Sequence, residues 1–466
     1  MPVANSVKEI LEKRQLEYTV SQAPGDALAG RSTFDRYMRQ VGGIRSQLVE
    51  DDNGTLLVLF PGDCMLDLRR LSLETGRQLT AAKPNSVQSM QDKLGVQSIP
   101  ALPNIAGLRT LVDERLLDKE HLKIDSGGIG ELVILSKDNF KPLMENVEVA
   151  DICVTIDELE ALQPQGDDET EITNAVKNFT TMRIQQRLEE TLELPPLPQT
   201  AQRIIKLRVD PNADVSDLAT IVETDPSLAA QVVSWAASPY YSAPGKIKSV
   251  HDAIVRVLGF DMVLNLSLGL SLGKTLNMPK DGPRGVTPYW QQAVYTAATM
   301  EALVTAIPRA HRPGFGLAYL SGLLNNFGYL ILAEVFPPHF ETICRYIETN
   351  PHISTHLIER HILGVTREQI VSWLMGVWHL PEEVCTALRH QQHPGYEGEH
   401  HEYANLTFAA LRLLRQQGIG TGPREPVPEI LYERLHLEHD RALEAIDNVL
   451  ESSEELQNIA QALDGA

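Results

Sequence analysis

The apolar pattern of this chain changes near residues 165–180, and that change limits the architectures the sequence can adopt. Before it, short apolar runs end at glycine or proline, as in Thr55–Phe60 followed by Pro61-Gly62, or follow a glycine cluster, as in Glu131–Leu135. Such runs are typical of buried strands. After it, apolar residues recur at helical spacing. The sequence therefore predicts two domains, an N-terminal α+β domain and a C-terminal all-α domain.

An acidic segment, Asp157–Glu171, lies at this change of pattern. It contains Pro164 and Gly166, and a charged run with these residues is typical of a solvated linker. We therefore predict four parts along the chain. They are an α+β domain at 1–156, an acidic linker at 157–180, a helical domain at 181–420 and a C-terminal helical extension at 421–466.

Start and stop signals divide the second half into helices. Thr224-Asp225-Pro226 opens one of them, because Thr224 or Asp225 can cap the helix and proline suits its first turn. Ser249 starts the next helix. Further helices are predicted at 289–306, 315–333, 337–348, 354–361, 367–377, 381–390 and 401–416.

Composition excludes several classes of protein. The 466 residues carry a net charge of −21, which argues against non-specific binding to nucleic acid, since that binding relies on Lys and Arg facing phosphates. The four cysteines lack Cys-x-x-Cys spacing, so neither a disulfide framework nor a zinc knuckle is expected. The N-terminus lacks a signal-peptide pattern, and the apolar stretch 263–272 is too short to span a bilayer. We predict a cytoplasmic protein that binds neither membrane nor DNA.

Motifs in the second half occur in a fixed order that resembles the HDOD family, relatives of the HD and HD-GYP metal-dependent phosphohydrolases. The resemblance covers roughly 185–410 and implies a helical bundle of the HD type. The motifs are Leu194–Pro198, Asp217–Leu228, Ser238–Tyr241, Ile247–Gly259, the stretch 318–330, and Trp378–Pro381 leading to His390.

In HD enzymes the metal ligands come from separated places, and the resemblance identifies each of these positions here. The early histidine is replaced by Gln292, the His-Asp pair by Asn325-Asn326, and the late aspartate by Asn405. An amide is neutral and offers one weakly basic oxygen, so we expect no two-metal centre and no cofactor. His361 and His390 remain, with His393 one helical turn beyond His390.

These residues are predicted to converge in one pocket, because they occupy positions that meet at a metal in the family. A cluster of amides and imidazoles could hold itself together through hydrogen bonds, or it could accept a small polar ligand. Both alternatives stay open at this point. The predicted pocket comprises Gln292, Asn325, Asn326, His361, His390 and Asn405.

The first half, over about 1–155, resembles the YbaK/prolyl-tRNA editing family of aminoacyl-tRNA deacylases. The resemblance rests on Leu57–Asp63 with Leu66–Leu71, on Leu94–Pro100, and on Leu111–Asp113 followed by Ile124–Ile129. It implies a functional lysine on a strand and a glycine–proline substrate loop. Arginine and valine stand at two of those positions, so editing activity is not expected. The predicted editing-site positions are Arg45, Val96, Ser98 and Pro100.

Both halves therefore resemble enzyme folds that have lost their reactive groups. We predict a bacterial, non-catalytic regulatory protein that acts in signal transduction by binding an unknown protein partner or a small polar ligand, with tRNA an improbable partner. The alternative is an enzyme. It would be either a residual aminoacyl-tRNA deacylase in the N-terminal domain or a metal-dependent phosphohydrolase in the C-terminal domain.

Overall fold

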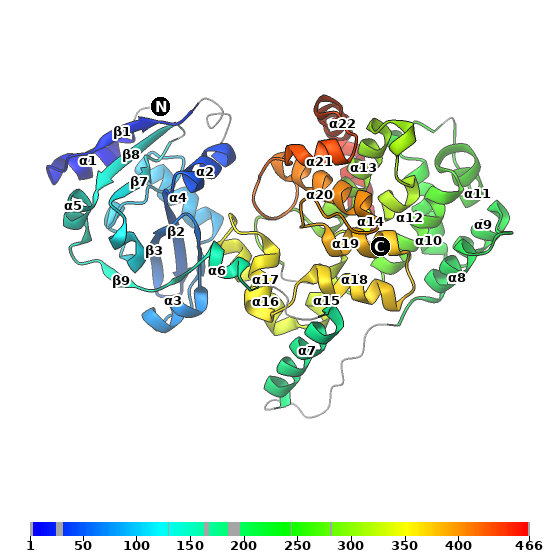
Figure 1. The fold of residues 1–466 in the computed structure, drawn as a ribbon, viewed down its shortest axis with the longest axis horizontal. Coiled ribbons are helices and arrows are strands. Elements are labelled where there is room, and N and C mark those ends of the chain that lie inside the picture. Colours follow the sequence, from blue (N-terminus) through cyan, green and yellow to red (C-terminus); the bar gives the residue numbers. More distant parts are fainter. Residues whose placement is uncertain are drawn as a thin grey trace. The chain divides into compact units, whose positions relative to one another are not determined.

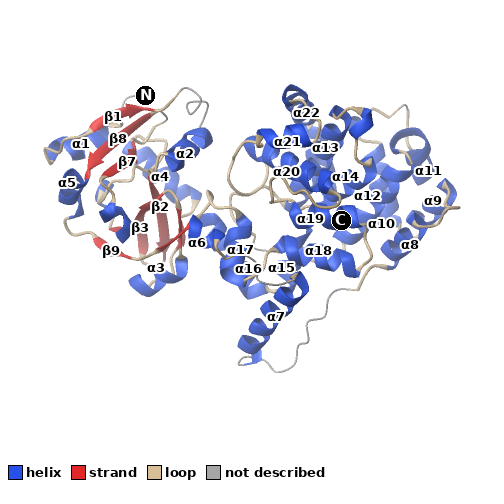
Figure 2. Cartoon of the chain, viewed as in Figure 1, coloured by secondary structure: helices blue, strands red, loops and turns tan. Residues whose placement is uncertain are grey.

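The computed structural model describes residues 3–24, 31–128, 130–162, 167–184, 196–243, 245–279 and 282–464. Contacts divide the chain into two compact units. Unit 1 comprises Met1–Gln163, Thr342–Ile358 and Gly422–Arg424, and unit 2 comprises Pro164–Glu341, Glu359–Thr421 and Glu425–Ala466. The described strands all lie in unit 1, and the described elements of unit 2 are helices (Figures 1 and 2). The predicted fold class, α+β followed by all-α, is confirmed.

Eight of the described strands form one mixed sheet in unit 1, in the order β1-β8-β7-β2-β3-β6-β9 with β5 paired to β2, while β10 pairs with β4 separately. β2 and β3 form an antiparallel hairpin, and at its turn the Asn53 N–H donates to Asp51 Oδ1 at 2.8 Å. The strands are β1 Thr19–Gln22, β2 Ile44–Asp51, β3 Gly54–Pro61, β4 Cys64–Leu66, β5 Thr80–Ala81, β6 Thr110–Asp113, β7 His121–Asp125, β8 Glu131–Ser136, β9 Glu148–Ala150 and β10 Cys153–Thr155.

The two faces of this sheet bury different clusters. On one face, Ile44 and Leu48 of β2 pack with Val7 of α1 and with Ile99 and Ile105. On the other face, the side chains that alternate with these, Val49 among them, pack against α3, β4 and β10. Because successive side chains of a strand point to opposite faces, neighbouring residues of β2 belong to different clusters. The helices of unit 1 include α1 Asn5–Lys13, α2 Arg31–Gln40, α3 Leu68–Thr75, α4 Pro84–Leu94, α5 Lys137–Phe140 and α6 Ile156–Glu160.

Unit 1 also contains a segment from much later in the chain, Thr342–Ile358. The chain passes from unit 2 to unit 1 within helix α16 (Pro337–Thr349) and returns to unit 2 within helix α17 (Thr355–Leu363). The sequence placed these residues in the helical domain at 181–420. The predicted domain boundaries stay predictions, but a division into consecutive stretches does not describe the contacts.

Unit 2 is built around helices that are buried along most of their length. In α14, a Cβ on Gly322 would lie 2.7 Å from Cα of Ala297 in α13, so the absence of a side chain allows the two helices to approach closely. The helices are α7 Asp168–Ile184, α8 Gln199–Arg208, α9 Val215–Glu223, α10 Pro226–Ala236, α11 Val250–Ala253 with the π-helix Ile254–Leu258, α12 Phe260–Gly273, α13 Tyr289–Ala306, α14 Phe315–Leu324, α15 Phe327–Val335, α18 Arg367–Val377, α19 Glu382–His390, α20 His401–Gln416, α21 Glu429–Arg434, α22 His439–Glu451 and α23 Ser453–Asp464.

Most predicted helices are confirmed within one or two residues, and α13, α18 and α20 match the predicted bounds. Asp225 caps α10 as predicted, accepting from the N–H of Leu228 at 3.0 Å. The single helix predicted at 315–333 is wrong, because it is interrupted at Asn325-Asn326. Asn326 has φ −105° and ψ 11°, outside the helical range, so α14 ends there and α15 begins.

The range predicted as a solvated acidic linker contains helical structure. It includes most of α6 and much of α7, whereas Pro164 and Gly166 lie outside the described residues. Asp168 and Glu171 at the start of α7 form side-chain hydrogen bonds with other helices of unit 2. This part of the acidic segment is therefore engaged in contacts and not simply solvated.

Within the described residues, one stretch, Phe315–Val335, has the length and hydropathy of a membrane span. Its most apolar window is 83% buried inside unit 2. We therefore interpret α14 and α15 as core helices of the bundle.

Candidate functional site

The break between α14 and α15 holds the first two residues of the predicted pocket. Asn325 is 5% exposed, and its Nδ2 donates to the carbonyl of Gly322 at 2.6 Å. Asn326 is 8% exposed, and its Oδ1 accepts from Nη1 of Arg367 at 2.9 Å. The two amides therefore cap the end of one helix and receive an arginine of α18.

The residues from α19 to α20 bring His390 and Asn405 to a common neighbour. The ring of His390 stacks on Tyr396 with centroids 3.8 Å apart, and Nδ2 of Asn405 donates to the Tyr396 carbonyl at 3.0 Å. Gln391 connects them to α14, since its Nε2 donates to the carbonyl of Asn325 at 2.9 Å. Tyr396 thus contacts both His390 and Asn405, and Gln391, next to His390 in sequence, contacts the backbone of Asn325. The convergence of the three side chains in one pocket stays a prediction.

Burial lowers the pKa of His390 to about 4, and the neighbouring Arg389 and His393 act in the same direction. The Nδ1 atoms of His390 and His393 lie 3.3 Å apart. A lowered pKa keeps the His390 imidazole neutral at pH 7, so one of its ring nitrogens is an acceptor.

The other two predicted residues are less firmly connected to this group. Gln292 lies in the first turn of α13, and its Nε2 donates to the carbonyl of Thr287 at 2.6 Å. His361 lies in α17 and is half-exposed. Their convergence with Asn325, His390 and Asn405 stays a prediction.

The donor atoms at these positions do not fit a divalent metal centre. The amides at Asn325 and Asn405 direct their nitrogens to backbone carbonyls, and the oxygen of Asn326 faces a cation, Arg367. No group of three or more His, Cys, Asp or Glu side chains placed to hold a metal ion occurs within the described residues. A two-metal hydrolytic centre requires carboxylate ligands, and these positions offer only neutral amides and imidazoles.

Two acceptors in this group are buried without a hydrogen-bond partner among the described residues, Oδ1 of Asn405 and Oε1 of Gln391. Asn405 is fully buried and Gln391 is 2% exposed. Buried polar atoms of native proteins are usually paired, so these two oxygens are acceptors that the described residues leave unsatisfied.

Sequence reasoning missed a charged cluster that borders these amides. Arg367, which contacts Asn326, forms a buried ion pair with Glu359 of α17, and its backbone N–H donates to Glu359 Oε2 at 2.9 Å. Burial raises the pKa of Glu359 to about 7, and Arg367 opposes that shift. A second ion pair joins Arg389 of α19 to Asp168 of α7. These residues belong to none of the motifs. The one signal in the sequence was the acidity of residues 157–171, which include Asp168.

In unit 1 the structure brings three of the four predicted editing-site positions together. A Cβ on Gly127 would lie 2.7 Å from Cγ1 of Val96 and 3.2 Å from Cγ of Pro100. Ser98 Oγ donates to Asp125 Oδ2 at 2.6 Å, and the other oxygen of Asp125 accepts from the Gly127 N–H at 2.9 Å. The loop at 96–100 therefore packs closely on Gly127, with the side chain of Val96 filling the contact.

Arg45 is not at this loop. The neighbouring residue Ser46 donates from Oγ to the carbonyl of Ile99 and so faces the loop. Arg45 alternates with it, pairs across strands with Phe60, and lies on the opposite face of the sheet. Arg45 and the loop at 96–100 therefore lie on opposite faces of the sheet, and the assignment of Arg45 to the lysine position stays a prediction.

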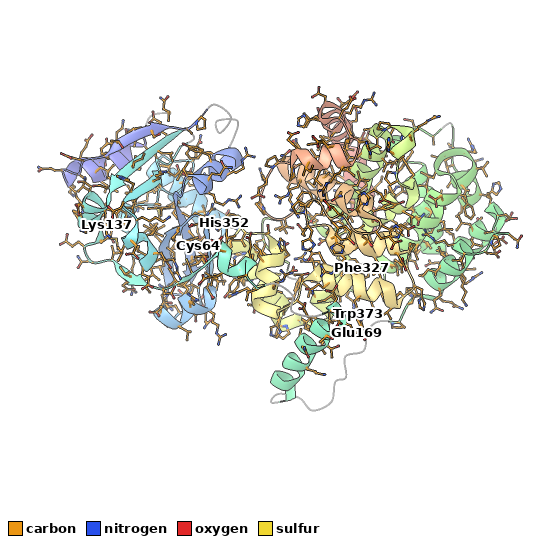
Figure 3. All side chains as sticks on the ribbon, in the orientation of Figure 1. Cys64, Lys137, Glu169, Phe327, His352 and Trp373 are labelled. Atoms are coloured by element: carbon orange, nitrogen blue, oxygen red, sulfur yellow. The ribbon has the colours of Figure 1, made fainter. Side chains whose placement is uncertain are left out.

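The segment Thr342–Ile358 packs on the face that Arg45 occupies. Nε2 of His352 lies 2.9 Å from the carbonyl of Cys64, and its ring is 6.1 Å from that of Phe60 (Figure 3). The OH of Tyr346 donates to Asp67 Oδ1 at 2.7 Å. Burial lowers the pKa of His352, and the positive charge of Arg45 adds to this effect.

Comparisons with known proteins agree with this architecture. A model of the HDOD domain matches residues 194–394, and a model of the aminoacyl-tRNA editing domain matches residues 40–142. The structure of a candidate signal transduction protein from Marinobacter aquaeolei VT8 is similar over 100% of both chains, with 40% identity and a TM-score of 0.87. An HDOD domain protein from Geobacter sulfurreducens is 22% identical over 64% of this chain and 98% of its own, with a TM-score of 0.47.

A curated relative from Treponema pallidum (strain Nichols), an uncharacterized protein, is 22% identical over 268 residues. The match covers 58% of this chain, and the chain spans about half the length of that relative. On the Marinobacter match and the two domain models, the chain belongs to the HDOD domain proteins that carry an N-terminal aminoacyl-tRNA editing domain.

Proposed function

We propose that this protein is a non-catalytic signal transduction protein that acts by binding. The observation that carries the proposal is the use of the amides at the former metal positions. One end of each amide is bonded within the fold: Nδ2 of Asn325 to the Gly322 carbonyl, Oδ1 of Asn326 to Arg367, and Nδ2 of Asn405 to the Tyr396 carbonyl. Groups committed in this way stabilise the fold and do not activate water.

The chemistry of the residues supports binding over phosphate hydrolysis. A metal-dependent phosphohydrolase needs anionic ligands to hold its ions and a lowered water pKa to generate a nucleophile. The position of the His-Asp pair instead carries Asn326, whose oxygen accepts from Arg367. An arginine at this distance would repel a divalent ion.

The packing in unit 1 supports a binding role for the editing fold as well. Ser46, not a lysine, faces the loop at 96–100, and Val96 fills the space beside Gly127. The net charge of −21 also disfavours tRNA as a ligand. We propose that unit 1 acts as a binding module in the cytoplasm of a bacterium, in a signalling pathway with a protein partner.

The test uses the full chain in two assays. Cyclic dinucleotides and nucleotides are incubated with Mn²⁺, Mg²⁺ or Fe²⁺, and alanine-charged proline tRNA is incubated separately. We expect no turnover above a buffer blank in either assay. Phosphohydrolysis that is lost in Asn405→Ala would overturn the proposal for unit 2. Release of alanine that is lost in Ser98→Ala would overturn it for unit 1.

A further inference from the structure

An ion pair joins helices α7 and α19 in unit 2. Asp168 of α7 receives two bonds from Arg389, from Nε to Oδ2 and from Nη2 to Oδ1, the second at 2.9 Å. Gln369 of α18 donates from Nε2 to Oδ1 of Asp168 at 2.9 Å and to Oε2 of Glu171 at 2.7 Å. The guanidinium of Arg389 thus binds both oxygens of the Asp168 carboxylate, and the amide of Gln369 donates to one of them. Bidentate guanidinium contacts of this kind are how proteins recognise carboxylates and phosphates.

A second arginine, Arg360, lies near Arg389 and Asp168. Arg360 of α17 is 8% exposed, and its buried Nε has no hydrogen-bond acceptor among the described residues. Burial lowers the pKa of Arg360, the like charge of Arg389 adds to that effect, and Glu368, Glu171 and Asp168 oppose it. A buried guanidinium that only distant carboxylates offset is costly, which indicates that the place is suited to an anion.

The charges show what α7 contributes to this cluster. Arg360 lies near Arg389 and near a buried carboxylate, Glu368, whose Oε2 has no partner within the described residues; Arg367 and Arg415 also act on Glu368. Asp168 and Glu171 of α7 add two negative charges to this arginine-rich cluster. Glu169, between them in sequence, is exposed and labelled in Figure 3. The two acids that face the cluster therefore behave as a ligand supplied by the chain itself.

We propose that Arg360, Gln369 and Arg389 form a binding site for a small phosphorylated molecule, and that Asp168 and Glu171 occupy this site as a built-in competitor. The guanidinium fork and the amide of Gln369 would bind the phosphate oxygens. The unpartnered Oε2 of Glu368 would accept from a hydroxyl or amino group of the same ligand. Binding would release the first turn of α7.

Among the described side chains of α7, Ile172 and Ala175 are buried and apolar, and Asp168 and Glu171 make the polar contacts given above. The inference adds an effector site to the proposed binding role. Its test measures phosphate binding directly, so it can fail or succeed whatever the outcome of the turnover assays.

The experiment titrates inorganic phosphate into the full chain by calorimetry. Asp168→Asn/Glu171→Gln removes the competing charges and is expected to tighten phosphate binding at least tenfold over the wild type. Adding Arg360→Met to that background should abolish the gain, since the cation of Arg360 is lost. The matched control is Glu169→Gln, which removes the same charge from the exposed side of α7 and should leave the affinity unchanged.

A second measurement on the wild type covers the case in which the double variant does not fold. Amide hydrogen exchange of residues 168–177 is recorded with and without saturating phosphate. Faster exchange with phosphate supports displacement of the first turn. Phosphate affinity that is equal in the wild type and the double variant would overturn the proposal. So would an increase of the same size in Glu169→Gln, or exchange in the wild type that phosphate leaves unchanged.

Discussion

Asn350 pairs with the backbone of Leu66 through both ends of its amide, although 284 positions separate the two residues in sequence. Its Oδ1 accepts from the Leu66 N–H at 2.8 Å, and its Nδ2 donates to the Leu66 carbonyl at 3.0 Å. Leu66 lies in β4, whose described partner in the sheet pairing is β10 alone. The side chain therefore satisfies backbone groups that a further strand would otherwise pair with.

Removing that side chain should destabilise unit 1. Asn350→Ala leaves a buried N–H and a buried carbonyl of Leu66 without partners, and we expect a loss of about 1–3 kcal/mol in the free energy of unfolding. The measurement is urea denaturation of the full chain. Asn212→Ala, at an exposed asparagine, is the control and should change little. Equal stability of Asn350→Ala and the wild type would contradict the pairing.

The contact between Val96 and Gly127 gives a second prediction. Gly127 has φ +91°, and an added Cβ would lie 2.7 Å from Val96 Cγ1. Gly127→Ala should therefore destabilise by about 1–3 kcal/mol, from backbone strain together with the clash. In Val96→Gly/Gly127→Ala the clash is removed and the strain remains, so part of the loss should return. Thermal unfolding of the two single variants and the double variant measures the coupling, and strictly additive losses would argue against direct contact.

The third prediction concerns the amides of the predicted pocket. Asn326→Ala removes the acceptor of Arg367 Nη1, and Asn325→Ala removes a capping bond to the Gly322 carbonyl. Because both sites are buried, each change should lower stability by about 1–3 kcal/mol. Differential scanning calorimetry of the variants provides the comparison. Melting temperatures close to that of the wild type would mean that the amides are not structural, and a screen for small polar ligands would follow.

The half-buried carboxylate of Glu301 gives a prediction for pH. Burial raises the pKa of Glu301 to about 7, while a hydrogen bond from the OH of Tyr241 opposes the shift. A folded-state pKa above the ordinary value of 4.5 means that the folded protein binds the proton more tightly than the unfolded chain does. The stability from this group is full below pH 4.5 and is lost as the pH rises to about 7.

Glu301→Gln keeps an acceptor for Tyr241 and removes the charge. We therefore expect the variant to be more stable than the wild type at pH 8, with the difference shrinking as the pH falls toward 4.5. Unfolding free energies of both proteins at several pH values are compared. A difference that does not depend on pH would show that Glu301 does not titrate in this range.

The sequence predicted the parts of this fold that local signals determine. α10 begins at the expected cap because Asp225 and Pro226 act on their own helix. The break at Asn325-Asn326 carries no such local signal, and Asn326 there contacts Arg367, a residue 41 positions away. The face of the sheet on which Arg45 lies could not be predicted either, since only the pairing of β2 with its neighbours determines which face a side chain occupies.

In the candidate site, too, local motifs predicted some residues and missed those that only packing brings together. Motif spacing singled out His390 and Asn405, which both contact Tyr396 in the structure. It did not single out Arg360, Arg389 or Asp168, because these belong to no motif and come together only through packing. The contact between α7 and Arg389 could not be predicted from composition, since an acidic stretch is typical of a solvated segment unless its cationic partners are known.

The course of the chain through Thr342–Ile358 limits how such a protein can change during evolution. A single recombination at the acidic segment would separate most of unit 1 from a stretch that its strand β4 needs, so neither half could be exchanged as an intact module. The two domains would therefore have to be inherited together, because the sequence of unit 2 contains a segment that completes unit 1.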